Sequence, residues 1–362
     1  MVTPPNYVPI LKGKEGEFAA LQELYLDVRV GLLPLIEVPA VPRDYAKGGL
    51  AKELDEYVAP VASRLRKCWG TSDLYLDLAR IGSSEYLNDG RIALDRVLED
   101  CASLGVSAIP VLSLASSLKY IEVASGYSAS SGKGVCLRLG IKDFQEDVDL
   151  EVEVDRIFGV LRSFGDCPAD LIIDLEDLDP NSATLIARSV FSMIPRKDEW
   201  RWMVLAASSF PEDLSEVYAA TTSALPRHEW NLWKTLQRKP NALPRRDLVY
   251  GDYAIAHPVM KELDPRTMRM SASIRYTTED GWLVVKGRNV RQYGFEQYFE
   301  LAQELVGLPQ YSGRKYSWGD EYIDDCAVRM AGPGNATTWR KVGVNHHLTL
   351  VARELAKLAS GA

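Results

Sequence analysis

The chain has 362 residues, of which 46% are hydrophobic and 25% charged, as expected for a globular protein with a substantial core. Its 42 Lys and Arg residues against 50 Asp and Glu residues give a formal net charge of -8, which excludes a global positive field that would attract nucleic acid or anionic membranes. The five cysteines are widely spaced and form no C-x-x-C pair, and no stretch reaches the roughly 18 apolar residues of a membrane helix. We therefore expect a reduced, cytoplasmic protein that makes no membrane contact.

Short apolar runs of strand length alternate with longer amphipathic stretches along most of the chain. This alternation is typical of βα units built on a parallel sheet. Eight runs are predicted as strands, the number that a closed barrel requires. They cover residues 7–12, 33–38, 74–78, 108–112, 135–139, 171–175, 202–207 and 248–253.

Helices are predicted between these strands. They cover residues 15–29, 51–67, 91–104, 116–126, 146–164, 181–194 and 212–224. The pattern predicts an α/β fold, a TIM-like (β/α)8 barrel. A doubly wound open sheet is the alternative, but its Gly-rich first turn is missing, since Gly13-Lys14-Glu15-Gly16 lacks the G-x-G-x-x-G spacing.

The pattern changes after the eighth predicted strand. Residues 271–277 and 282–287 alternate as strands around Asp280-Gly281, a strong hairpin signal. A helix over 295–306, a Gly- and aromatic-rich loop and a last helix over 345–359 follow. We therefore expect one barrel over residues 1–362, with residues 265–345 as a hairpin and helix elaboration of the eighth connection.

Charged residues lie at the ends of most predicted strands, where the active sites of barrels of this type form. Buried charges are costly unless they pair or bind a ligand. Four carboxylates are predicted to hold Mg²⁺ or Mn²⁺, namely Glu37, Asp77, Asp174 and Glu176. The predicted substrate-binding residues are Lys12, Arg80, Arg138, Arg275, Arg340 and Asn345. The alternative is that these charges neutralise one another and anchor loops.

Two of the four histidines are adjacent, at His346 and His347, where the last predicted helix begins. Asn345 is a good N-cap, and a helix start in this connection is a common phosphate site. Either imidazole is a candidate general acid or base, oriented by Asp320 or Asp252. The alternative is that one histidine packs under the loop against a backbone carbonyl and the other is solvated.

Three blocks carry a resemblance to a known family: YVPILKGKEGE at 7–17, PLIE at 34–37, and a tail with Gly319-Asp320, Gly334-Asn335, Trp339-Arg340 and Asn345-His346-His347. The chain resembles the Beta-protein family, which is found in phages and bacterial genomes. The resemblance extends over nearly the whole chain, and these three blocks are its specific part. The resemblance implies a phage, prophage or mobile-element setting and no particular reaction. It also implies that the first strand, the second strand and the tail carry the site.

Taken together, these features predict a metal-dependent hydrolase or phosphoryl-transfer enzyme that acts on a phosphorylated nucleotide or nucleic-acid end. Its setting would be a phage, a prophage or antiviral defence. A second enzyme hypothesis is a metal-free glycoside hydrolase or lyase that uses two carboxylates such as Glu37 and Glu176. The third hypothesis is a non-catalytic binding or regulatory protein on a barrel scaffold, with a protein partner.

Overall fold

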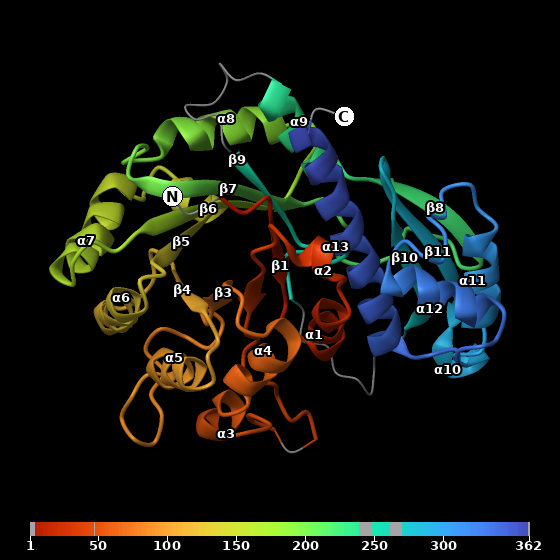
Figure 1. Cartoon of the computed structure of the whole chain (residues 1–362), viewed down its shortest axis with the longest axis horizontal. Coiled ribbons are helices and arrows are strands. Elements are labelled where there is room, and N and C mark those ends of the chain that lie inside the picture. Colours follow the sequence, from red (N-terminus) through yellow and green to blue (C-terminus); the bar gives the residue numbers. More distant parts are fainter. Residues whose placement is uncertain (1–3, 47, 239–247, 261–269, 361–362) are drawn as a thin grey trace. The chain divides into compact units, whose positions relative to one another are not determined.

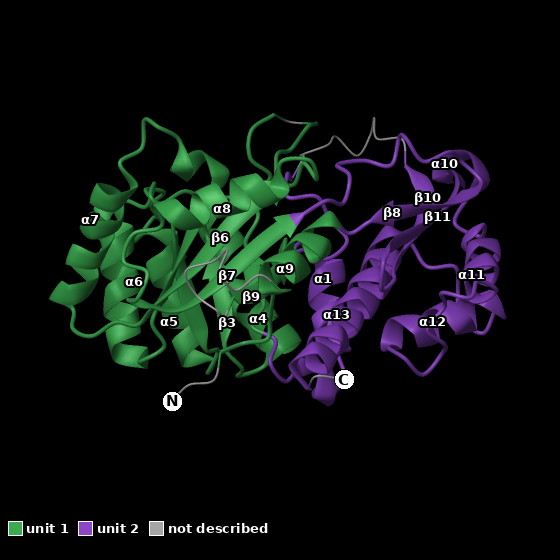
Figure 2. Ribbon diagram, turned by 90° about the horizontal axis from the view of Figure 1, so that it is seen from above, with its two compact units in different colours: residues 1–13, 33–207, 228–252 green, residues 14–32, 208–227, 253–362 purple. Residues whose placement is uncertain are grey.

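The computed structural model describes residues 4–46, 48–238, 248–260 and 270–360 (Figure 1). Its backbone contacts divide the chain into two compact units, which Figure 2 colours separately. Unit 1 comprises residues 1–13, 33–207 and 228–252, and unit 2 comprises residues 14–32, 208–227 and 253–362. The expected elaboration over 265–345 belongs to unit 2, and its residues 265–269 lie outside the described part of the chain.

Unit 1 is a closed eight-stranded parallel barrel, as predicted. The first strand pairs with the second through Ile10 and Leu35, and with the last through Tyr7 and Tyr250, which closes the barrel. The barrel strands are β1 (Tyr7–Leu11), β2 (Leu35–Glu37), β3 (Leu74–Asp77), β4 (Ala108–Leu112), β5 (Val135–Gly140), β6 (Ala169–Asp177), β7 (Trp200–Ser208) and β9 (Leu248–Asp252). Together with the alternating helices, they make the fold a TIM-like (β/α)8 barrel.

Helices connect these strands (Figure 1). The predicted helix over 51–67 is divided in two at Pro60, which cannot donate a backbone hydrogen bond inside a helix. The helices of unit 1 are α3 (Leu54–Val58), α4 (Val61–Trp69), α5 (Ala93–Ser103), α6 (Leu118–Ser131), α7 (Leu150–Ser163), α8 (Ala183–Met193) and α9 (His228–Arg238), with a 3-10 turn η1 (Ile141–Phe144) after β5.

The expected helix over 212–224 is wrong. Residues 221–226 instead form a strand, β8 (Thr221–Pro226), and the helix that precedes β9 is α9. β8 pairs antiparallel with β11 (Gly281–Asn289), which in turn pairs with β10 (Ser271–Thr277). The hairpin of β10 and β11 was predicted, but its third strand depends on a partner that follows much later in the chain, a pairing that local periodicity does not report.

The last helix also differs from the prediction. α13 (Ala336–Ser360) begins nine residues before Asn345, so Asn345 is not its N-cap. Asn335 has that role, since its Oδ1 accepts hydrogen bonds from the backbone N–H groups of Thr337 and Thr338. A further helix, α12 (Trp318–Ala327), lies in the segment expected to be a loop. The other helices of unit 2 are α1 (Glu15–Gln22), α2 (Leu26–Arg29), α10 (Val290–Tyr293) and α11 (Tyr298–Val306).

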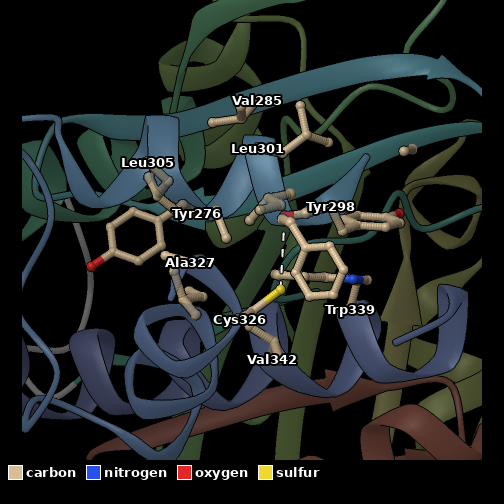
Figure 3. Close-up of a cluster of buried hydrophobic side chains, with 14 of the residues drawn as sticks. Tyr276, Val285, Tyr298, Leu301, Leu305, Cys326, Ala327, Trp339 and Val342 are labelled. Atoms are coloured by element: carbon tan, nitrogen blue, oxygen red, sulfur yellow. Dashed lines mark hydrogen bonds between the residues drawn. The ribbon is translucent and has the colours of Figure 1, made fainter. Parts of the chain in front are cut away.

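A hydrophobic core joins the sheet of unit 2 to its helices (Figure 3). Tyr298 of α11 stacks on Trp339 of α13, with ring centroids 4.6 Å apart. Cys326 of α12 donates its thiol to the carbonyl oxygen of Tyr298 at 3.8 Å. Since three helices contribute to this one cluster, burial of apolar surface holds them together. No helix of the described residues is both long enough and apolar enough to span a membrane.

Candidate functional site

The carboxyl ends of the barrel strands bring together six charged side chains, which we call the Arg138 cluster. Lys12 follows β1, Glu37 ends β2, Asp77 ends β3 and Arg80 follows it, while Arg138 and Asp174 lie in β5 and β6. The strand register explains why they meet. Glu37 is paired with Asp77 on the neighbouring strand, and Asp174 is paired with Gly140, two residues after Arg138. The side chains of the cluster therefore lie at the same end of the barrel.

Arg138 is the centre of the cluster. Its Nη1 donates to Glu37 Oε1 at 3.0 Å and to Asp77 Oδ2 at 2.8 Å. Its Nε and Nη2 donate to Asp174 Oδ2 at 3.0 and 2.7 Å. Without it, Glu37 and Asp77 would be two like charges side by side, which destabilises a sheet. The guanidinium therefore compensates three carboxylates from three strands.

Glu37 is the most heavily compensated carboxylate. Its other oxygen accepts from Lys12 Nζ at 2.9 Å, and Arg80 Nη2 lies 3.4 Å from Oε1. Burial alone would raise the pKa of Glu37, but the positive charges of Arg138, Lys12 and Arg80 outweigh it and lower the pKa to about 2. Glu37 is therefore ionised throughout the physiological range.

Burial dominates at two other members of the cluster. It lowers the pKa of Lys12 although Glu37 opposes the shift, and it raises the pKa of Asp77 although Arg138 opposes the shift. Asp77 also accepts the backbone N–H of Ala79, and Asp174 accepts that of Glu176. Each shift favours the neutral form of the buried group, as lack of solvation does.

Glu176 stands apart from the other three predicted metal ligands. It is exposed and makes no ion pair with any described residue, and its backbone adopts a left-handed φ of 54°. Partial burial and the negative charge of Asp174 raise its pKa. Strained, non-glycine backbone of this kind is concentrated at functional sites.

The other predicted ligands, Glu37, Asp77 and Asp174, converge on a guanidinium. No group of three or more His, Cys, Asp and Glu side chains that could hold a metal ion is present in the described parts of the chain. At the Arg138 cluster, a divalent cation would have to share or replace the contacts of Arg138. Binding of Mg²⁺ or Mn²⁺ stays a prediction.

Asp252, a candidate to orient a histidine, contacts tyrosines. It ends β9 and accepts hydrogen bonds from the hydroxyls of Tyr7 at 2.5 Å and Tyr250 at 3.0 Å. The two rings stack with their centroids 5.7 Å apart. This carboxylate therefore links the first and last strands where the barrel closes.

His346 makes its contacts within unit 2. Its Nδ1 lies 2.8 Å from Asp320 Oδ2 and its Nε2 lies 2.8 Å from the carbonyl oxygen of Thr277. Asp320 also accepts from the hydroxyls of Ser317 and Tyr276, at 2.6 and 2.8 Å. Every one of these side chains is fully buried, so the set forms a polar network inside the core of unit 2.

His347 and Asn345 are buried in the same helix. Nδ1 of His347 lies 2.8 Å from Thr277 Oγ1. Asn345 accepts the backbone N–H of Gly319 at 2.9 Å and donates to the carbonyl oxygen of Ala20 at 3.1 Å. Asn345 therefore ties α13 to α12 and α1, and neither His346 nor His347 is solvated.

Arg275 and Arg340, the other predicted substrate-binding residues, also lie in unit 2. Arg275 donates Nη1 to the carbonyl oxygen of Ile255 at 2.9 Å, and Nη1 of Arg340 lies 3.5 Å from the same oxygen. The structure brings these two arginines together on one acceptor. Ile255 and both arginines belong to unit 2, whereas the six residues of the Arg138 cluster belong to unit 1.

Sequence reasoning missed a second ion pair in the barrel. Arg201 donates to both oxygens of Asp170, at 2.7 and 2.5 Å, and Tyr75 donates to Asp170 at 2.8 Å. These residues lie at the start of their strands, the end of a barrel associated with stability. The signal was a charge at the second position of each of two strands, Asp170 in β6 and Arg201 in β7, with hydrophobic residues on both sides.

Comparison with known proteins supports the resemblance noted in the sequence. A search of curated proteins found no match to the chain. The profile of one family, described as Beta protein, matches residues 7–353, nearly the whole chain. This match includes the strands that carry the Arg138 cluster and the helices that carry the network of unit 2. The chain belongs to the Beta protein family.

Proposed function

We propose that the barrel unit binds a phosphorylated nucleotide or nucleic-acid end at the carboxyl ends of its strands and hydrolyses the phosphate ester. The observation that carries this proposal is that two solvent-accessible groups lie at the carboxyl ends of the strands, namely Arg80 of the Arg138 cluster and Glu176, two residues after Asp174. Arg80 forms one long ion pair, with Glu37, and Glu176 has a raised pKa and forms no ion pair with a described residue. Together they offer a phosphate-binding group and a proton carrier.

Arg80 is suited to bind the phosphate. Its side chain is 35% exposed, and its ion pair with Glu37 is long at 3.4 Å. A guanidinium has five N–H donors in a planar fork that matches phosphate oxygens. Arg138 is 15% exposed, and its Nη1 contacts the same carboxylate, Glu37. Its N–H groups bind protein carboxylates, but its positive charge still adds to the attraction of an anion.

Glu176 is suited to transfer a proton. Its raised pKa means that the carboxyl group keeps its proton to a higher pH than an ordinary glutamate does, and this proton can be donated to the leaving oxygen of a phosphate ester. In the proposed step a water oxygen bonds to phosphorus, the ester P–O bond breaks, and the leaving oxygen takes the proton of Glu176. The proton released by the attacking water restores Glu176, so the net reaction adds one water to the ester.

A metal ion is not part of this step. The carboxylates expected to hold Mg²⁺ or Mn²⁺ form hydrogen bonds with Arg138, and the cationic side chains supply positive charge where the phosphate would sit. Dependence on Mg²⁺ or Mn²⁺ is therefore tested as a separate variable. The phage, prophage or defence setting follows from the resemblance alone and stays a prediction.

A non-catalytic binding protein is the second candidate, because most charges of the Arg138 cluster are already compensated. Lys12 pairs with Glu37, and Arg138 pairs with three carboxylates. Such a balanced set suits a rigid scaffold as well as an active site. The two candidates differ in whether the bound phosphate ester is turned over.

Phosphate release from a panel of nucleotides and 5′- and 3′-phosphorylated oligonucleotides, with Mg²⁺, with Mn²⁺ and with EDTA, tests the proposal. We expect turnover by the wild type, a fall in kcat of about 100-fold or more in Glu176→Gln, and a raised KM in Arg80→Gln. Glu151→Gln, an exposed carboxylate on α7, is the matched control and should be unaffected. Binding without turnover would favour the second candidate, and neither binding nor turnover would contradict both.

A further inference from the structure

Two neighbouring arginines of unit 2 share one hydrogen-bond acceptor. Arg275 lies on β10 and Arg340 in the first part of α13, and both are only partly exposed. No carboxylate of the described residues forms an ion pair with either guanidinium. Other arginines of the chain do pair with acids, as Arg314 does with Glu321 and Arg201 with Asp170.

The two guanidinium groups face the same place. Nη1 of Arg275 and Nη1 of Arg340 lie 2.9 and 3.5 Å from the carbonyl oxygen of Ile255. One carbonyl oxygen can satisfy only part of this donor set, because each guanidinium carries five N–H donors. Most of the donors of the pair therefore have no protein acceptor among the described residues.

The pair is also held in place. The guanidinium of Arg275 lies over the ring of Phe210, 4.7 Å from its centroid, and Phe210 packs edge-on against Trp282 at 5.2 Å. On the other side, the aliphatic part of Arg340 lies against the backbone of Gly16, where even a methyl group would come within 2.9 Å of it. Both side chains are therefore already held in place before a ligand binds. Binding then costs little further conformational entropy of these side chains.

Keeping two positive charges together here has a cost. Burial lowers the pKa of Arg275 to about 9, and the neighbouring charge of Arg340 adds to the effect. An anion between the groups would remove this repulsion and accept the remaining donors. A carboxylate matches a single guanidinium, whereas a phosphate dianion, with its higher charge and three terminal oxygens, matches two.

We infer that Arg275 and Arg340 form a phosphate-binding site in unit 2, with the carbonyl oxygen of Ile255 fixing their orientation. Its ligand is inorganic phosphate or the terminal phosphate of a monoester. The inference does not rest on the function proposed for the barrel unit, since none of its residues belongs to the Arg138 cluster.

Calorimetric titration with inorganic phosphate, phenyl phosphate and acetate at constant ionic strength tests this site. The protein is Arg80→Gln, in which the barrel unit has lost its own proposed phosphate contact. We expect phosphate or phenyl phosphate to bind, and Arg340→Gln added to this background to weaken binding by about tenfold or more. Arg288→Gln, on the same sheet with its side chain over Tyr293, is the control and should leave the affinity unchanged.

The ligands distinguish the sources of the phosphate group. Tighter binding of phenyl phosphate than of inorganic phosphate assigns the site to esters, and the reverse assigns it to the free ion. Acetate binding as tightly as phosphate, or no binding of any of the three, would overturn the inference. Loss of binding in Arg288→Gln as well as in Arg340→Gln would also overturn it.

A second measurement uses the unmodified protein and needs no variant to fold. Phenylglyoxal reacts with accessible guanidinium groups, and mass spectrometry locates the labelled residues. We expect saturating phosphate to slow the labelling of Arg275 and Arg340 several-fold and to leave Arg288 unchanged. Equal labelling of Arg275 and Arg340 with and without phosphate would contradict the site even if phosphate binds elsewhere.

Discussion

Arg138 donates two hydrogen bonds to a single oxygen of Asp174, at 3.0 Å from Nε and 2.7 Å from Nη2. This leaves its Nη1 directed at Glu37 and Asp77, the two carboxylates that are paired across β2 and β3. Asp174 therefore orients the guanidinium that compensates the other two. The stability of the barrel and the charge of its candidate site depend on the same contacts.

Removing Arg138 should destabilise the barrel strongly. Arg138→Met leaves three buried carboxylates without their shared partner, and breaking a buried ion pair in this way costs about 3–5 kcal/mol. Urea denaturation measures the change. Arg162→Met is the control, since its ion pair with Glu199 is exposed and should contribute less than about 1 kcal/mol. Similar losses in the two variants would show that the Arg138 cluster is not energetically special.

Glu37 should make the protein sensitive to acid. Its pKa of about 2 is below the value of about 4.5 in the unfolded chain, so its contribution is present above pH 4.5 and is lost as the pH falls towards 2. We expect Glu37→Gln to flatten the dependence of the unfolding free energy on pH in this window, by at most about 1.4 kcal/mol per pH unit.

Asp77 should have the opposite effect on the pH dependence of stability, so the contributions of Asp77 and Glu37 can be distinguished. Because its pKa is raised, it favours the folded state at low pH, and this contribution is lost as the pH rises. Asp77→Asn should therefore steepen the net fall in stability on acidification, or leave it unchanged, whereas Glu37→Gln flattens it. A flatter acid limb in Asp77→Asn would contradict the assignment of these shifts.

The strain at Glu176 can be measured by replacement with glycine. Its left-handed φ of 54° costs any residue with a Cβ about 1 kcal/mol or more, and glycine avoids this cost. Glu176→Gly should therefore be more stable than Glu176→Ala by about 1 kcal/mol. At Glu122, in the right-handed helix α6, we expect the reverse order. The same order at both positions would contradict the strain.

Gly319 allows α12 and α13 to approach closely. A Cβ at this position would lie 2.5 Å from the carbonyl oxygen of Val342, whereas one at Gly332 would meet no atom within 4 Å. Gly319→Ala should cost about 1–3 kcal/mol of unfolding free energy, because the two helices must move apart. Gly332→Ala is the matched control and should change stability by less than about 0.5 kcal/mol.

The barrel could be predicted because each of its strands is a buried apolar run between amphipathic helices. Ala108–Leu112 was predicted to the residue, since both faces of that strand are buried. β8 could not be predicted, because its stability comes from pairing with β11, which follows only after α9, β9 and β10. The start of α13 was misplaced because the buried Asn345 was read as a helix cap instead of a link between helices.

The sequence also indicated which residues are charged at the strand ends, but not which of them meet. Lys12 and Glu37 come together only when β1 and β2 pair, and Arg138 reaches Glu37 across the end of the barrel. These contacts depend on register and closure, which local periodicity does not contain. The same limit applies to Asp320, whose partners Tyr276 and Ser317 come from a strand and a helix cap.

The central claim is that the Arg138 cluster binds a phosphate ester through Arg80. The most direct test is calorimetric titration of the nucleotide and oligonucleotide panel into Arg340→Gln, in which the phosphate site of unit 2 is weakened, and into the same protein with Arg80→Gln added. We expect at least one phosphorylated ligand to bind the first protein, and the second to bind it about tenfold or more weakly, as loss of a charged hydrogen bond predicts. Equal affinities in the two proteins, or no binding to either at millimolar concentration, would contradict the claim.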